Sequence, residues 1–247
     1  MDNIKEAIEY IAKLGVEAEK AEVLEIAGKT YCTKRLSRYG EKPKAEAIEA
    51  TTLTALVDYI KESRSELRER SIIQIISPTR VSLFSGLLEE RDREELFRVN
   101  AMLPTFYYGE EYEQEKFLVS IQSCFSESPD REAVTLLASN IVNTQQATYS
   151  DDGITQQAVI KTGITTKAEA LVPNPVTLIP YRTFLEVEQP ASAFVFRIKE
   201  GRDGSPTFKL VEADGGRWKA QAMENVKKYL TEALADIPER DKITIIA

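Results

Sequence analysis

Strand-like runs separated by very short turns are the feature that most constrains the fold of this chain. Ser71–Ser77 and Val81–Leu87 are rich in β-branched and aliphatic residues and flank Pro78. Ala193–Lys199 and Thr207–Ala213 flank a turn that contains Arg-Asp-Gly. Parallel strands need a crossover of a dozen or more residues, so such close strands pair antiparallel. We therefore expect sheets that are mainly antiparallel.

Helical periodicity and helix-capping residues alternate with these runs. Apolar residues recur at helical spacing in residues 3–14, and Thr51 or Thr52 precedes a second helical stripe. Ser128-Pro129 is a helix start, and a long helix that carries Trp218 is expected to follow two glycines. The predicted fold class is α+β: a mainly antiparallel sheet with several helices and a long C-terminal helix packed on the sheet.

Four other segments complete this prediction. Glu94–Met102 suits a third strand or a short helix, and Arg182–Val187 suits a strand. Thr144–Tyr149 and Ile154–Lys161 are joined by a turn sequence with glycine and form a predicted hairpin.

The length of 247 residues permits one large domain or two small ones. We expect an N-terminal helix-plus-sheet half at residues 1–126 and a C-terminal, mostly antiparallel sheet half with the long helix at residues 127–247. One continuous domain is the alternative.

Histidine is absent from the sequence, and this absence excludes several classes of enzyme. Histidine is the only side chain whose unperturbed pKa lies between pH 5 and 8, and it is the commonest metal ligand. Ser-His-Asp and Cys-His nucleophiles and most zinc catalysis are therefore excluded. We assign no catalytic residue, no metal ligand and no cofactor. A Mg²⁺-dependent hydrolase with dispersed carboxylates is the least supported alternative.

Cysteine use and hydropathy indicate a cytoplasmic protein without a membrane partner. Cys32 and Cys124 are far apart and form no CxxC motif, which favours free intracellular thiols over a disulfide. The N-terminal residues carry charges every few positions, and no apolar run approaches about 18 residues. We therefore expect neither a signal peptide nor a membrane span.

A cluster of cations between Lys29 and Lys44 contrasts with the formal net charge of −8. Such a cluster can bind a phosphate backbone, a nucleotide or another small anion. A solvated strand-and-loop face is the favoured alternative, and contact with an acidic protein surface is a third. The residues assigned to anionic-ligand or nucleic-acid binding are Lys34, Arg35, Arg38, Tyr39, Lys42 and Lys44.

The segment Phe106–Glu115 complements this cluster, because it combines aromatic residues with glutamates. We hypothesise that it contacts the basic segment of a neighbouring subunit. A surface loop whose aromatic rings turn inward is the alternative and is slightly favoured. The predicted hairpin at residues 144–161 is polar on both faces, so it either pairs across an interface or stays a solvated edge. The residues assigned to an oligomer interface are Phe106, Tyr107, Tyr108, Glu110, Glu111, Tyr112, Gln145 and Gln156.

Three C-terminal stretches are similar to one known family. They are Asp151–Ile164 (DDGITQQAVIKTGI), Pro180–Arg197 (PYRTFLEVEQPASAFVFR) and Leu210–Leu230 (LVEADGGRWKAQAMENVKKYL). Together they resemble the YfdQ-like family of bacteriophage and prophage proteins, to which no activity is assigned. The likeness covers roughly residues 50–247. It implies a phage or prophage origin and the cytoplasm of a bacterial host, and it supplies no catalytic residues.

These observations lead to one expected function and two alternatives. We expect a non-enzymatic phage or prophage accessory protein that acts as a homo-oligomer. The first alternative is a nucleic-acid-binding accessory of phage replication or recombination. The second is a protein that sequesters a nucleotide signal and so counters host defence.

Overall fold

The structure is a computed structural model, and it divides the chain into two compact units, Met1–Lys44 and Ala45–Ala247. We call them unit 1 and unit 2. The residues described are 2–19, 21–26, 28–33, 44–63, 65–67, 70–88, 91–141, 156–162, 166–172, 174–202, 204–238 and 240–247.

Unit 1 consists of a helix and a small hairpin. Helix α1 (Asp2–Glu19) covers the predicted helical stripe. Strands β1 (Val23–Ile26) and β2 (Lys29–Cys32) pair antiparallel across Gly28, whose φ of 74° suits glycine. None of the side chains described in this unit is buried.

The first sheet of unit 2 has five strands, and we call it the five-stranded sheet. Three strands in its middle pair antiparallel, as their short connections predict. Two pairings are parallel, between β13 and β4 and between β3 and β6, so this sheet is mixed. Both parallel pairs join strands far apart in the sequence. The lengths of the turns between neighbouring strands therefore could not predict these pairings. The order is β13 (Ile243–Ile246), β4 (Ser71–Ser77), β5 (Arg80–Phe84), β6 (Glu95–Asn100) and β3 (Ile48–Ala50).

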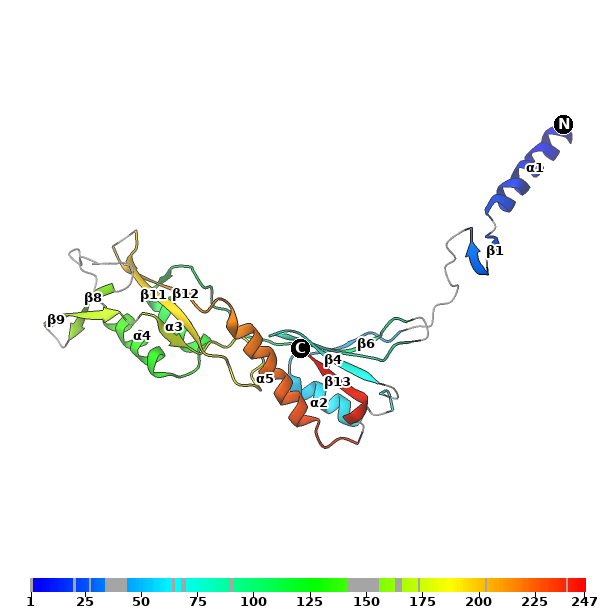
Figure 1. Cartoon of the computed structure of the whole chain (residues 1–247). Helices are drawn as coiled ribbons and strands as arrows, with labels where there is room; N and C mark the ends of the chain where they lie inside the picture. Colours follow the sequence, from blue (N-terminus) through cyan, green and yellow to red (C-terminus); the bar gives the residue numbers. More distant parts are fainter. Residues whose placement is uncertain are drawn as a thin grey trace. The chain divides into compact units, whose positions relative to one another are not determined.

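Helices α2 (Leu53–Glu62) and α5 (Arg217–Ala233) pack on the five-stranded sheet (Figure 1). The Thr52 hydroxyl accepts a hydrogen bond from the Ala55 N–H at 3.3 Å and caps α2, as the sequence predicts. Helix α5 contacts β4 and β13, which confirms the long C-terminal helix on the sheet. The apolar core beneath the helices includes Leu53, Leu56, Ile73, Ile75, Val81, Leu83, Val226 and Leu230.

A second, antiparallel sheet carries the other core of unit 2. Helices α3 (Gln114–Cys124) and α4 (Pro129–Asn140) contact it and each other. Phe117 on α3 stacks on the rings of Phe196 and Phe208, with centroid distances of 5.7 and 5.0 Å. The strand order is β10 (Val176–Leu178), β11 (Ser192–Glu200), β12 (Pro206–Glu212) and β7 (Tyr112–Glu113).

Each of these cores contains residues from both sides of position 126. Leu53 and Ile73 share one core with Val226, and Phe117 shares the other with Phe208. Residues from before and after position 126 therefore contribute to the same two cores of unit 2. The predicted halves 1–126 and 127–247 do not coincide with these cores.

The predicted strand at Arg182–Val187 is wrong, because this segment forms bends and turns. The Gln189 side chain replaces a strand partner there. Its Oε1 accepts hydrogen bonds from the Arg182 and Thr183 N–H groups, and its Nε2 donates to the carbonyls of Thr183, Phe184 and Val187. A single amide thus satisfies backbone groups that a strand would have paired with a neighbour.

The remaining elements bear on two other predictions, the strand or helix at Glu94–Met102 and the hairpin at residues 144–161. Glu94–Met102 forms a strand, β6, rather than a helix. Strand β8 (Gln156–Thr162) pairs antiparallel with β9 (Thr166–Val172). The other half of the predicted hairpin, at residues 144–149, lies outside the described residues. A short 3₁₀ helix, η1 (Arg240–Lys242), precedes β13.

The Gln189 amide should contribute measurably to stability. We expect Gln189→Ala to lower the free energy of unfolding by about 2 kcal/mol, because it leaves backbone groups of the 182–187 segment without partners. Urea unfolding measures this difference. Gln122→Ala, at an exposed position on α3, is the control and should change it by less than about 0.5 kcal/mol. Equal stability of the two variants would contradict this role for Gln189.

Candidate functional site

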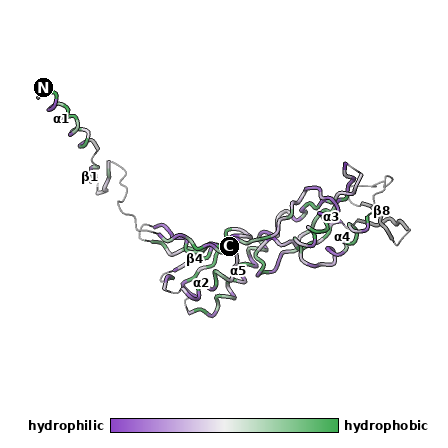
Figure 2. The backbone as a smooth tube through the Cα atoms, turned by 180° about the vertical axis from the view of Figure 1, so that it is seen from behind, coloured by the Kyte–Doolittle hydropathy of each residue, from purple (hydrophilic) through white to green (hydrophobic). Residues whose placement is uncertain are grey.

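Unit 1 presents apolar side chains that the unit itself does not bury. Ile4, Ile8, Ile11 and Leu14 of α1 are 46–69% exposed. Figure 2 shows apolar and polar residues alternating along this helix. We call these four residues the α1 stripe. The spacing of four, three and three residues places them on one face of the helix.

The hairpin of unit 1 adds to this apolar surface. Val23, Ile26 and Tyr31 are all at least half exposed. Most of the stability of a helix in a protein comes from packing of its apolar face, and isolated two-stranded hairpins are marginal in water. Unit 1 therefore has elements that need a packing partner and no buried core among its described residues.

Unit 2 contains a buried arginine with two carboxylate neighbours. Only 8% of Arg182 is exposed. Its Nη1 lies 2.5 Å from Oε1 of Glu212, and its Nη2 donates to the Ser192 hydroxyl. The same hydroxyl donates to Oδ2 of Asp214 at 2.7 Å. Burial lowers the pKa of Arg182, although the nearby carboxylates oppose that shift. Arginine stays charged at neutral pH nonetheless.

Aromatic rings surround this guanidinium. Its carbon lies 4.0 Å from the ring centroid of Trp218, 5.6 Å from Phe194 and 5.9 Å from Tyr108. Trp218 is in the first turn of α5, and Phe194 is on β11. Cation–π contacts of this kind are strengthened when the cation is desolvated. The cluster therefore ties the start of α5 to the second sheet.

Asp214 holds the turn before α5. Burial acts to raise the pKa of its carboxyl, but hydrogen bonds from the Ser192 hydroxyl and the Gly216 N–H, together with Arg182, lower it below the ordinary range. Gly215 and Gly216 have φ values of 64° and 82°, which other residues rarely adopt. The Asp-Gly-Gly turn thus positions Trp218 against Arg182.

A pocket of about 360 Å³ opens beside this cluster. Burial raises the pKa of its Tyr108 hydroxyl, so the phenol stays protonated at neutral pH. The Cys124 thiol lies 3.7 Å from the Thr105 carbonyl, as a weak donor. The lining residues are Thr79, Ala101, Leu103, Pro104, Thr105, Phe106, Tyr108, Cys124, Tyr181, Arg182 and Trp218.

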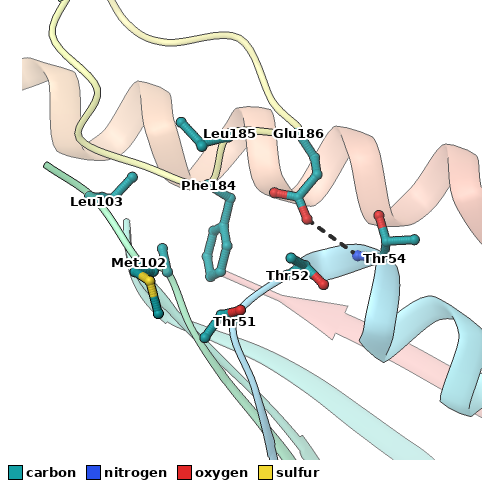
Figure 3. A pocket seen from close by; sticks show the side chains of 9 residues that line it. Thr51, Thr52, Thr54, Met102, Leu103, Phe184, Leu185 and Glu186 are labelled. Carbon is teal, nitrogen blue, oxygen red and sulfur yellow. Dashed lines mark hydrogen bonds between the residues drawn. The ribbon is translucent and has the colours of Figure 1, made fainter. Parts of the chain in front are cut away.

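A second pocket of about 460 Å³ adjoins the first, because both are lined by Ala101 and Leu103. Figure 3 shows Phe184 and the loop above it, opposite Met102 and the start of α2. Oε1 of Glu186 accepts hydrogen bonds from the N–H groups of Leu53 at 2.7 Å and Thr54 at 3.4 Å. This carboxylate therefore occupies the positive end of the helix dipole.

The predicted basic surface is almost wholly outside the described part of the chain. Lys34, Arg35, Arg38, Tyr39 and Lys42 lie in residues 34–43, which the structure does not describe. Lys44 is described and exposed. Binding of nucleic acid or of a nucleotide signal by this segment stays a prediction.

The structure separates the residues of the predicted oligomer interface. Phe106 and Tyr112 stack in the second core with centroids 4.8 Å apart, so their rings turn inward. Tyr107 is 55% exposed, and Glu111 pairs with Lys199 at 3.5 Å. Tyr108 is partly buried beside Arg182, while Glu110 is exposed. The side chains of Gln145 and Gln156 lie outside the description, and the interface stays a prediction.

Sequence reasoning did not find Arg182, Asp214 or Glu212 as a cluster. These residues meet only because β11 and β12 pair and bring Glu212 opposite Phe194. The one available signal is Trp218, the sole tryptophan of the chain, which follows the Asp-Gly-Gly turn. A tryptophan at the start of a helix predicts that the helix packs against another element there. The neighbouring sequence does not show which residue it contacts.

Both cysteines are free thiols, with Cys32 exposed and Cys124 buried. Among the described residues, no three His, Cys, Asp or Glu side chains gather as a metal-binding group. No helix in the described ranges is both long and apolar enough to cross a bilayer. Comparison of the chain with family models, curated proteins and solved structures gives no match.

The Asp214 carboxylate should make stability depend on pH. Its folded-state pKa is lowered, so its contribution is present above the ordinary carboxyl pKa of about 3.9 and is lost as the pH falls through the lowered value. We expect Asp214→Asn to lower stability at pH 7 and to reduce the loss of stability below about pH 4. Urea unfolding at a series of pH values measures both effects.

The matched control is Asp58→Asn, which removes an exposed carboxylate of α2. It should leave the acid dependence of the parent protein unchanged. If the Asp214 variant showed the same acid dependence as the parent protein, the carboxylate would have no such role.

Proposed function

We propose that this protein is a non-enzymatic phage or prophage accessory protein that acts as a homo-oligomer, and that its subunits associate through α1. The observation that carries the proposal is the exposed α1 stripe in a unit without buried side chains among its described residues. A second copy of the same helix offers the same apolar face, and most soluble oligomers are symmetric assemblies of identical chains.

The spacing of the stripe supports a helix–helix contact. Ile4, Ile8 and Ile11 follow the four-three spacing of the core positions of a coiled coil, and Leu14 widens the face. Lys5 and Glu9 pair at 3.9 Å outside this stripe and are largely exposed. The charged residues can therefore stay in water when the stripe is covered.

The magnitudes are sufficient for association. Burying one Ile or Leu side chain contributes about 1.5–3 kcal/mol. The stripes of two copies would contribute roughly 12–24 kcal/mol as an upper estimate, against a cost of about 4–15 kcal/mol for bringing two molecules together. A dimer at micromolar concentration is consistent with this balance.

The phage or prophage assignment rests on the resemblance of three C-terminal stretches to the YfdQ-like family. These stretches include Pro180–Arg197 and Leu210–Leu230, which contain Arg182, Asp214 and Trp218. The bacterial cytoplasm as the site of action rests on the same resemblance.

Removing apolar side chains from the stripe should break the assembly. We expect the full-length protein to be an oligomer at micromolar concentration and Ile8→Gln/Ile11→Gln to be a monomer, because glutamine keeps helix propensity but removes the apolar contact. Size-exclusion chromatography with light scattering measures both masses.

The control is Glu6→Gln/Lys13→Gln, which changes the opposite face of α1 and should keep the parent mass. A parent protein that is a monomer, or an Ile8→Gln/Ile11→Gln variant that keeps the parent mass, would overturn association through α1.

A further inference from the structure

The pocket beside Arg182 has the size and walls of a small-molecule site. Its volume of about 360 Å³ lies in the range of ligand pockets. Phe106, Tyr108, Tyr181 and Trp218 supply aromatic surface, and Leu103 and Pro104 supply aliphatic surface. Walls of this composition favour a flat, largely apolar molecule.

Three donor groups of residues that line this pocket have no hydrogen-bond partner within the part of the chain that the structure describes. Among the described residues, the buried Nε of Arg182 and Nε1 of Trp218 have no hydrogen-bond acceptor. The hydroxyl of Tyr108 has no hydrogen-bond partner in the same part of the chain. The two nitrogens are enclosed by the protein, whereas Tyr108 is partly exposed and lines the pocket, so its hydroxyl can donate to a bound molecule that carries an acceptor.

The charges at this pocket disfavour an anion. Arg182 is the buried cation, and it already faces the carboxylates of Glu212 and Asp214. An added phosphate or carboxylate would have to compete with these two carboxylates for the only charged residue, among those described, that lines the pocket. An uncharged molecule avoids this competition.

We infer that the pocket beside Arg182 binds an uncharged, planar aromatic molecule that carries hydrogen-bond acceptors, the chemistry that nucleobases share. The flat ring lies against the aromatic walls, and a carbonyl oxygen or ring nitrogen accepts from the Tyr108 hydroxyl. This site lies wholly in unit 2 and uses none of the α1 stripe. Its ligand binding is therefore independent of the proposed association through unit 1.

Nucleosides are the probes for this site. Adenosine, guanosine, cytidine and uridine are titrated into the full chain up to 1 mM (~10⁻³ M, the weak end of specific binding). Isothermal calorimetry gives the affinity, and the fluorescence of Trp218, the only tryptophan, reports occupancy of this pocket. We expect at least one nucleoside to bind and to change the Trp218 emission.

Two variants locate the ligand. Tyr108→Phe removes a single hydroxyl and should weaken binding about fivefold, the loss of one hydrogen bond. Tyr107→Phe is the matched control, because Tyr107 is exposed and does not line the pocket, and it should bind like the parent protein. Leu103→Trp fills the pocket and should weaken binding more than about twentyfold, measured by calorimetry alone because this variant carries a second tryptophan. Thermal unfolding without ligand checks that each variant is folded.

Charge provides the last comparison. Adenosine 5′-monophosphate carries the same base as adenosine and should bind at least about tenfold more weakly, because the only described cation that lines the pocket, Arg182, is already paired with Glu212. Absence of binding by all four nucleosides would overturn the inference. So would unchanged affinity in both the Tyr108→Phe and Leu103→Trp variants, or tighter binding of the monophosphate.

Discussion

The segment from Pro180 to Gln189 joins the two cores of unit 2, and the rest of that unit depends on it. Arg182 is buried among rings of the second core, and Phe184, two residues later, is buried in the core of the five-stranded sheet. The buried Thr183 hydroxyl donates to the Pro78 carbonyl at 2.5 Å, at the turn between β4 and β5. The segment that makes these contacts forms bends and turns rather than a strand. The Gln189 amide supplies the hydrogen bonds that a sheet would have supplied.

The same segment determines the electrostatics of the candidate site. A buried guanidinium is tolerated only when carboxylates and aromatic faces compensate for lost hydration. Glu212 at the end of β12, Asp214 in the following turn and Trp218 at the start of α5 provide this compensation within seven positions of the sequence. The cluster is therefore both a structural joint and the wall of a pocket.

Unit 1 and unit 2 differ in how completely they bury their apolar residues. Unit 2 has two cores with many fully buried aliphatic and aromatic side chains. In unit 1 the isoleucines of α1 and the aliphatic residues of β1 are exposed. Helices and hairpins are stabilised mainly by packing. The exposed apolar residues of unit 1 are therefore explained if a partner molecule packs against them. Self-association through α1 and ligand binding beside Arg182 would then be separate properties of the two units.

Local sequence signals determined much of the secondary structure. Thr52 and Ser128 start α2 and α4, the Asp-Gly-Gly turn precedes α5, and the short turn at Pro78 joins β4 to β5, because caps and turns depend on neighbouring residues. Tertiary structure alone decided that β13 lies parallel to β4 and that Arg182 meets Glu212 and Trp218. Those outcomes depend on contacts between residues distant in sequence and on the burial of one particular cation. Neither leaves a periodic signal in the chain.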